Sequence, residues 1–506
     1  MLTVGMLAAA CGDGGDDSTS GAQGEPRAGG TLQFLTFQEV ATLDAGAARP
    51  TTGSGQLPLV AIYDMLAEVL PDGTIKPRLA QSVETQDQRV WTITLRAGLK
   101  FSDGTPFDAE AVKAAWDRMA DPATGSPSAG QVKTMKTYEV VDATTLKVTL
   151  AEKNSQWARY LMRGLGMIPS PTAVKTLGAA FAQKPVGAGP FTVDSYVRDD
   201  RLVLKRNPLY WDAPRPYLDS LVVRPVLGDG PRLDTFSSGD ADVIAFVIWS
   251  PELVQSIKQR LDTRIPPISG GQGIVLNTRK APLDDVRVRR ALLLAVDLAD
   301  LNDKVNAGGA ATVDSLFTKD SPFYSDAPSR PKTDLAMAQT LIDQYLAEKG
   351  GSINLELLGT ATSAVQNQAL QQRWSQLKGV KVSVQTLEPV AFVTRQGKGD
   401  FQMAGSAVAG VDPEPSMALA LQTGSALNFG GFSDPLVDKA LADGRTATTT
   451  QERAAVYRTL ETQFWAQVPL IPTFRLPYAF VVSKDVGGFR LIDDGLPDFH
   501  EAWLKK

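Results

Sequence analysis

The sequence predicts an α/β fold in which at least part of the sheet is parallel. Residues 353–385 read as a strand, a helix and a second strand in succession, which is the order of a βαβ unit. Other expected strands, such as residues 90–96, alternate apolar and polar residues, which is typical of a half-buried strand. With 506 residues the chain has room for about two to four domains of ordinary size.

Composition and charge exclude several classes of protein. Hydrophobic residues make up 43% of the chain and charged residues 21%, as in globular proteins. The net charge of -5 argues against a nucleic-acid or other polyanion binder. The only cysteine is Cys11 and the only histidine is His500, so an intrachain disulfide is excluded and a His/Cys metal site nearly so. We expect no metal and no cofactor, and we expect His500 on the surface of a C-terminal tail.

The first thirty residues read as a targeting segment and a tether. Residues 1–10 are apolar and end in three alanines before Cys11, which resembles the end of a bacterial lipoprotein signal. The stretch is short and carries no Lys or Arg ahead of it. Residues 1–11 are therefore interpreted as a signal remnant, with Cys11 as the acylated residue. Residues 12–30, rich in Gly, Asp and Ser, are expected to be a disordered tether.

The first part of the body predicts strands interrupted by helices. The spacing of Leu59, Ile62, Leu66 and Leu70 predicts a helix over residues 57–70. Asp108 is expected to cap a helix over residues 109–119. The other expected elements are a strand at residues 31–37, a linker at 77–82, a strand at 90–96 and a hairpin of residues 138–141 and 145–150.

A tight turn divides the chain at Pro185-Val-Gly-Ala-Gly-Pro190, where two glycines and two prolines lie within six residues. We interpret it as the junction at which the chain returns from an inserted region. Alternating strands are expected on its C-terminal side, and Asn207-Pro208 should end the second of them. Later expected elements are strands at residues 221–226, 241–247, 268–277, 353–358 and 380–385, and helices at 286–300, 333–345 and 364–378.

Taken in order, several motifs resemble those of one family, the extracellular solute-binding proteins of family 5. These are the oligopeptide-, dipeptide- and nickel-binding subunits of ABC importers. The resemblance covers roughly residues 31–506. The matching motifs are Ile62-Tyr-Asp-Met-Leu66, Pro71-Asp-Gly-Thr74, Trp91-Thr-Ile-Thr-Leu-Arg-Ala-Gly-Leu-Lys-Phe-Ser-Asp-Gly-Thr-Pro-Phe107, Pro185-Val-Gly-Ala-Gly-Pro-Phe191, Leu204-Lys-Arg-Asn-Pro-Leu-Tyr-Trp211, residues 276–292 and Asn428-Phe-Gly-Gly-Phe-Ser-Asp-Pro435.

The resemblance implies a bilobed fold of the periplasmic-binding-protein kind, type II, in a large form with an extra inserted region. Lobe I would comprise residues 31–58, 185–270 and 477–506, and lobe III residues 271–476. Region II, residues 59–184, would be the insertion. The crossings near residues 269–271 and 476–477 would act as a hinge, and the ligand would lie in a cleft between the lobes.

The resemblance also places the ligand site. Peptide-binding members carry an acidic residue that holds the peptide ammonium where this chain has Ala409, and often Trp where it has Ser406. Asp412 is the possible substitute for that acid, although it reads more readily as a turn or helix cap. The small residues of this segment favour a roomy, mostly uncharged pocket for a peptide held by its backbone or for another small polar solute. The candidate ligand-binding residues are Phe37, Arg49, Trp249, Thr360, Ser406, Ala407, Val408, Ala409, Asp412, Asn428 and Phe429.

The function implied is capture of a small ligand outside the cytoplasm and its delivery to an ABC permease. The protein would be a monomer, anchored to the outer face of the membrane by a lipid on Cys11. Two alternatives remain open: a ligand-sensing subunit of a membrane receptor, and a hydrolase of peptides or glycosides. The hydrolase is disfavoured because no pair of carboxylates has a recognisable spacing and only one histidine exists.

Overall fold

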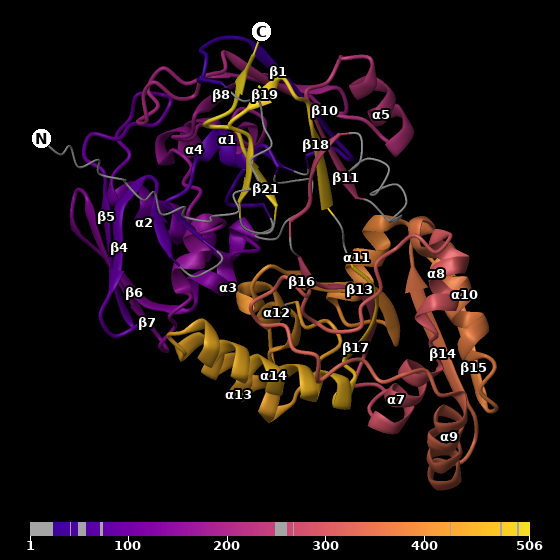
Figure 1. The fold of residues 1–506 in the computed structure, drawn as a ribbon. Coiled ribbons are helices and arrows are strands. Elements are labelled where there is room, and N and C mark those ends of the chain that lie inside the picture. Colours follow the sequence, from indigo (N-terminus) through magenta and orange to yellow (C-terminus); the bar gives the residue numbers. More distant parts are fainter. Residues whose placement is uncertain are drawn as a thin grey trace, which may run out of the picture.

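The computed structural model describes residues 24–40, 42–48, 57–70, 74–247, 261–266, 268–425, 427–475, 478–492 and 495–505. Cys11, Arg49, Trp249 and the crossing at residues 476–477 lie outside these ranges. Within them, three sheets of four or more strands organise the chain (Figure 1).

A seven-stranded sheet combines the first described strand, β1, with strands from the middle of the chain and with β18 near its C-terminus, in the order β12-β18-β11-β1-β10-β9-β8. Central β1 runs parallel to both β10 and β11, whereas the remaining pairs are antiparallel. The helix α5 (Asp229–Ser237) leads into β11. The strands are β1 (Thr31–Thr36), β8 (Phe191–Val197), β9 (Arg201–Arg206), β10 (Ser220–Pro225), β11 (Val243–Val247), β12 (Asp262–Arg264) and β18 (Tyr478–Val482).

A five-stranded sheet forms the second lobe, in the order β15-β14-β16-β13-β17. β14 is parallel to β15, as the βαβ order predicted, and it is also parallel to β16. The strands are β13 (Ser269–Leu276), β14 (Ile353–Gly359), β15 (Val380–Thr386), β16 (Met403–Gly410) and β17 (Leu470–Phe474). The helices are α7 (Val286–Ala295), α8 (Leu298–Asn306), α9 (Leu335–Lys349), α10 (Ala364–Trp374), α11 (Pro389–Gly397), α12 (Pro413–Leu421), α13 (Pro435–Thr446) and α14 (Thr450–Gln467).

A four-stranded antiparallel sheet, β4-β5-β7-β6, lies in the region between residues 59 and 184. Trp116 of α2 packs edge-on against Tyr138 of β6, which holds that helix to the sheet. The elements are α1 (Leu59–Tyr63), β2 (Ala67–Val69), β3 (Ile75–Pro77), β4 (Ala80–Thr85), β5 (Val90–Leu95), α2 (Ala109–Ala120), α3 (Ala129–Val132), β6 (Met135–Asp142), β7 (Thr145–Leu150), the 3-10 segment η3 (Trp157–Met162) and α4 (Pro171–Leu177). Short C-terminal pairs complete the fold: β19 (Val486–Gly487) with β22 (Trp503–Leu504), and β20 (Arg490–Ile492) with β21 (Leu496–Asp498).

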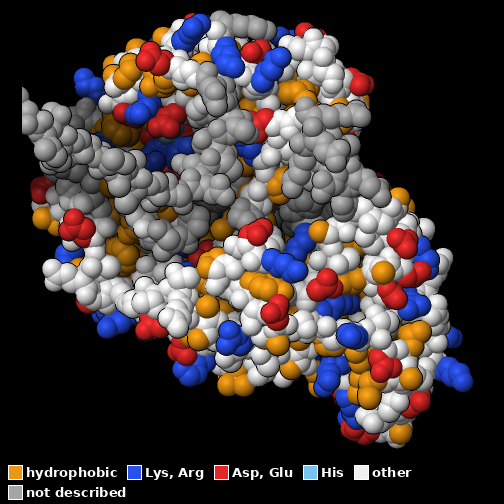
Figure 2. All heavy atoms as spheres, in the orientation of Figure 1, with side chains coloured by type: hydrophobic (Ala, Val, Ile, Leu, Met, Phe, Trp, Pro, Cys, Tyr) orange, Lys and Arg blue, Asp and Glu red, His pale blue; other side chains and the backbone are white. Residues whose placement is uncertain are grey.

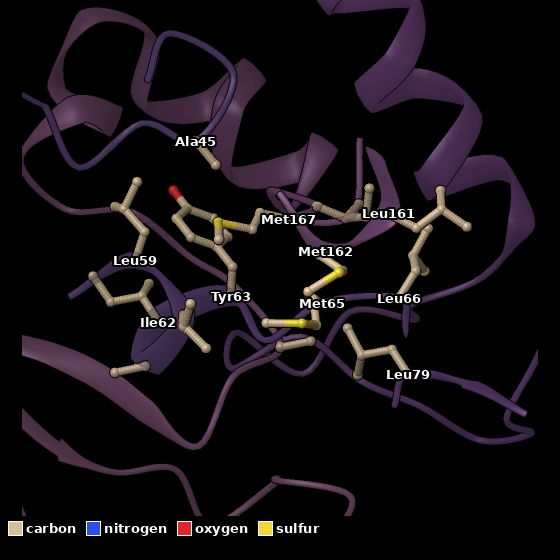
Figure 3. Packing of buried hydrophobic residues seen from close by; sticks show 14 of the residues in the cluster. Ala45, Leu59, Ile62, Tyr63, Met65, Leu66, Leu79, Leu161, Met162 and Met167 are labelled. Carbon is tan, nitrogen blue, oxygen red and sulfur yellow. The ribbon is translucent and has the colours of Figure 1, made fainter. Parts of the chain in front are cut away.

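Two large apolar cores divide the molecule into two bodies. One core joins the seven-stranded sheet to the four-stranded region, and Figure 3 shows part of it, with Met167 beside the ring of Tyr63 and Met65 beside Met162. The other core is confined to residues 274–474. Because burial of apolar surface is the main stabilising term, the first two sheets form one body and the five-stranded sheet the other.

The turn at residues 185–190 is packed against α1. Gly189 donates its N–H to the carbonyl of Ile62 at 2.9 Å, and Asn207 donates to the carbonyl of Gly189 at 2.8 Å. A Cβ on Gly189 would lie 2.5 Å from the carbonyl carbon of Ile62. The glycine therefore permits a close approach of two backbones.

Buried charges join the four-stranded region to the C-terminal residues. Arg78 donates to Asp64 at 3.0 Å and to Asp498 at 2.8 Å, and Arg490 donates to Asp498 at 2.9 Å. The prediction that His500 lies on the surface is wrong, because the ring is buried and its Nδ1 lies 2.8 Å from Asp498. Burial lowers the pKa of His500, but its hydrogen bonds to Asp498 and Glu501 prevail, and the pKa is raised.

Three predicted elements differ from the structure. The helix expected over residues 57–70 stops at Tyr63, because Asp64 has a φ of 56° and directs its carboxylate to Arg78. The helix expected over residues 286–300 divides into α7 and α8, since Asp297 caps a new helix by accepting from the N–H of Ala299. The linker expected at residues 77–82 runs into the strand β4. Across the part of the chain described, no helix is both long and apolar enough to cross a bilayer.

Candidate functional site

The second half of β16 forms an edge of the five-stranded sheet. Among the described residues, β14 pairs with β16 only at Met403 and Ala404, whereas β13 pairs with β16 along its whole length. Residues 405–410 therefore continue past β14 with one side unpaired by that strand. An unpaired strand edge is a place where another extended chain can add through main-chain hydrogen bonds.

The start of this edge is closed by a side chain. Gln396 of α11 donates to the carbonyl of Gly405 at 2.7 Å. Ala407, two residues on, is exposed, and its register partner on β13 is Gln272. Nε2 of Gln272 lies 3.5 Å from Oε1 of Gln366 on α10. Gln396 thus contacts the edge itself, whereas Gln272 and Gln366 lie beside β16 on the side of β13. Their amide groups can both donate and accept.

The other face of β16 lines a small pocket. Ser406 and Val408 meet Asn428 and Phe429 there. The free volume is about 20 Å³, enough for a water molecule and too small for a peptide side chain. The amide of Asn428 donates to the carbonyl of Phe432 at 2.7 Å, and its oxygen accepts from the N–H of that residue at 3.0 Å. Asn428 thus organises its own loop.

Asp412 follows β16 and caps α12, accepting from the N–H of Glu414 at 2.9 Å. Its carboxylate also accepts from both terminal nitrogens of Arg453, at 2.6 and 2.7 Å, and lies 3.2 Å from Arg159. Burial raises the pKa of Asp412, but the two arginines outweigh burial and lower it. The carboxylate is committed to these partners. Ala409, three residues earlier, is half-buried and has no polar group to offer in its side chain.

Thr360 follows β14, at the same end of the sheet as the edge of β16. Its hydroxyl lies 2.9 Å from that of Thr362, and its N–H donates to Ser363 at 3.1 Å. The hydroxyls of this segment therefore bond mainly to one another. Phe37 belongs to the other body, where it is half-buried against the first apolar core at the end of β1.

The structure thus brings Ser406, Val408, Asn428 and Phe429 together and keeps Phe37 in the opposite body. The three glutamines beside β16, Gln272, Gln366 and Gln396, were not predicted from the sequence. The small residues of β16 are the only local feature of the sequence that pointed to this site. The glutamines could not be predicted with them, because they come from three separate elements.

Charge is mixed at the surface. Figure 2 shows Lys and Arg interspersed with Asp and Glu on the visible face, in keeping with the small net charge. Within the described ranges, no three His, Cys, Asp or Glu side chains are grouped closely enough to hold a metal ion.

Comparison with known proteins gives a consistent family and fold. Residues 74–429 match the model of the bacterial extracellular solute-binding proteins, family 5. The periplasmic oligopeptide-binding protein OppA of Salmonella typhimurium is 26% identical over 452 residues, covering 83% of this chain and 82% of that protein. The glutathione-binding protein GsiB of Shigella flexneri is 28% identical over 477 residues, 92% of either chain.

A solved structure extends the likeness to the fold. The ABC transporter-associated periplasmic binding protein DppA of Helicobacter pylori, in complex with the peptide STSA, matches with a TM-score of 0.81 at 22% identity. The match covers 95% of this chain and 99% of that one. The predicted bilobed α/β fold is confirmed.

Proposed function

The chain belongs to the bacterial extracellular solute-binding proteins of family 5, and we propose that it captures a peptide between its two lobes and delivers it to an ABC importer. The relatives named above are oligopeptide- and glutathione-binding proteins. The runner-up ligand is another small, weakly polar solute. We propose binding without a chemical step.

The observation that carries this proposal is the edge of β16 beyond Ala404. An extended peptide would add to this edge through its main chain, with Ala407 and Ala409 leaving space for its side chains. The amides of Gln272 and Gln366 would then satisfy main-chain groups of the ligand.

We further propose that the ligand's N-terminal ammonium is not held by a carboxylate. Ala409 carries no charge, and the carboxylate of Asp412 is paired with Arg159 and Arg453. A charge-assisted hydrogen bond contributes about 1.5–3 kcal/mol. Because this protein would make no such bond to the ligand's ammonium, acetylation of the peptide N-terminus should leave the affinity unchanged.

Calorimetric titration with Ser-Thr-Ser-Ala and its N-acetyl form tests both points. We expect the two dissociation constants to agree within about threefold, because a tenfold ratio needs about 1.4 kcal/mol. The Ala409→Asp variant should bind the free peptide about tenfold more tightly than the acetylated one. The uncharged control Ala409→Asn should show no such preference. If acetylation of the peptide lowered its affinity for the wild-type protein more than tenfold, the proposal that no carboxylate holds the ammonium would be wrong. If no peptide of two to five residues bound, while native mass spectrometry found another solute, the peptide assignment would be wrong.

We propose that the lobes close about a hinge at residues 269–271 and 476–477. Lobe I, which comprises residues 31–58, 185–270 and 477–506, would move together with region II relative to lobe III. The separate apolar cores support this division. Arg475, next to the second crossing, donates to the carbonyl of Gly270 in the first at 2.8 Å. Gly270 has a φ of 78° and is buried inside β13, so close packing as well as backbone freedom favours glycine there.

We propose that a lipid on Cys11 holds the protein at the outer face of the membrane. Replacing Cys11 by Ala removes the thiol that would be acylated, so the variant should leave the membrane fraction and appear in the soluble extracytoplasmic fraction. Immunoblotting of the two fractions measures this. Equal membrane retention of Cys11→Ala and wild type would rule out the anchor.

A further inference from the structure

Region II meets lobe III where α13 lies beside β6 and β7 (Figure 1), and polar contacts join the two bodies there. Ser155 donates its N–H to the carbonyl of Arg445 at 2.6 Å and its hydroxyl to the carbonyl of Ala447 at 2.8 Å. Arg159 lies 3.2 Å from Asp412. The hydroxyl of Tyr160 donates to Glu414 at 3.5 Å. The segment of residues 155–160 therefore meets the start of α12 and the end of α13.

The contacts made by Arg159 and Tyr160 are shielded from water. The side chains of Arg159 and Asp412 are 5% and 4% exposed, and that of Glu414 is 1% exposed. A buried charge is costly unless it is paired and hydrogen-bonded. The contacts across this boundary are consequently specific in geometry, because Arg159 reaches the buried carboxylate of Asp412 only in this arrangement of the two bodies.

Each carboxylate on the lobe III side also has an arginine in its own lobe. Asp412 is bridged by Arg453. Glu414 is paired with Arg445 at 2.7 Å. If the bodies separate, these two pairs persist within lobe III.

The region II side also tolerates separation. Nε of Arg159 keeps its bond to Gln156 at 3.0 Å, so its guanidinium would enter water with one partner already in place. The boundary can therefore open without stranding a buried charge. This differs from Arg78, whose removal would leave Asp64 and Asp498 buried together.

The apolar cores show the same division. Region II shares one continuous core with lobe I, whereas lobe III has a core of its own. Apolar contact thus joins region II to lobe I permanently, and hydrogen bonds and ion pairs join it to lobe III. Polar contacts of this kind can be exchanged for water at modest net cost.

We propose that the arrangement seen here is the closed one and that region II is its latch: Ser155, Arg159 and Tyr160 hold lobe III in place by binding Asp412, Glu414, Arg445 and Ala447. The inference deepens the proposed function, on which it rests, by assigning the inserted region a role in it. The latch contributes a ligand-independent share of the closing free energy. Losing it lowers the fraction of closed molecules, and the apparent affinity falls by the same factor.

Distance measurement between spin labels tests the latch without any ligand. Cys11→Ser removes the only cysteine, and Glu139→Cys in β6 with Lys439→Cys in α13 supplies two exposed labelling sites on opposite sides of the boundary. In this background we expect Arg159→Met to shift the main distance to longer values and to broaden it. Lys147→Met, which removes an exposed cation from the same region, is the matched control and should leave the distribution unchanged.

A folded Arg159→Met protein with the parental distance distribution would overturn the proposal. If Arg159→Met failed to fold by circular dichroism, the double variant Ser155→Ala, Tyr160→Phe would decide. It deletes the two side-chain hydrogen bonds of Ser155 and Tyr160 across the boundary and keeps the packing of the tyrosine ring, so a longer distance supports the latch and an unchanged one refutes it. Because no ligand is used, failure here is distinguishable from failure of the peptide titrations.

Discussion

Replacing Arg78 by Met is expected to lower the free energy of unfolding by about 3–5 kcal/mol, the usual cost of breaking a buried ion pair by removing one partner. Arg78 is 3% exposed and is bonded to Asp64 and Asp498. Glu68 belongs to the same network, where it forms ion pairs with both Arg78 and Arg490. Without Arg78, the buried carboxylate of Asp64 loses its ion pair, and those of Glu68 and Asp498 share Arg490. Urea unfolding of the full chain, followed by circular dichroism, measures the loss.

Lys76→Met is the matched control for this variant. Lys76 lies 3.9 Å from Glu68, in the same network, but its side chain is 48% exposed. An exposed pair contributes about 0–1 kcal/mol, so this variant should unfold at nearly the parental urea concentration. If Arg78→Met and Lys76→Met lowered the free energy of unfolding equally, burial would not be what makes the ion pairs of Arg78 strong.

Gly189→Ala is expected to destabilise the protein by about 1–3 kcal/mol or more, as overpacking does. The new methyl group would meet the carbonyl carbon and oxygen of Ile62 at 2.5 and 2.6 Å, and the carbonyl oxygen of Ala61 at 2.7 Å. These are backbone atoms of α1, which is buried along its length, so they have little freedom to retreat. Thermal unfolding should therefore begin at a lower temperature.

Gly230→Ala controls for the loss of glycine itself. Gly230 lies in α5, and its added Cβ would have no heavy atom within 4 Å. Alanine there should stabilise the protein by about 0.4–1 kcal/mol, because it reduces the conformational freedom of the unfolded chain. If both alanine variants shifted the melting temperature in the same direction, the close approach at Gly189 would not be the cause.

Local signals predicted elements well where no distant partner intervened. The helix from Ala109 begins after Asp108, whose carboxylate accepts from Ala111 as its capping position predicted. The helix expected over residues 57–70 shows the opposite case. Its apolar residues are buried as the pattern requires, yet Asp64 ends the helix in order to reach Arg78 and Tyr210. Those partners are distant in sequence, so the pattern of residues near Asp64 carried no sign of them.

The candidate site shows the same limit. The small residues of β16 and the capping role of Asp412 could be inferred from the local sequence. The commitment of that carboxylate to Arg159 and Arg453 could not, because the arginines come from two other elements. Which residues of β16 have a free edge depends on where β14 ends beside it, and register between distant strands is a property of the whole sheet.

Closure of the two lobes around a captured solute can be measured by small-angle X-ray scattering of the full chain. The radius of gyration would be recorded without ligand and at saturation with a peptide whose binding calorimetry has established. We expect a smaller radius in the saturated protein, because a ligand that contacts both lobes stabilises the closed state. Saturated binding with an unchanged scattering curve would contradict capture between the lobes.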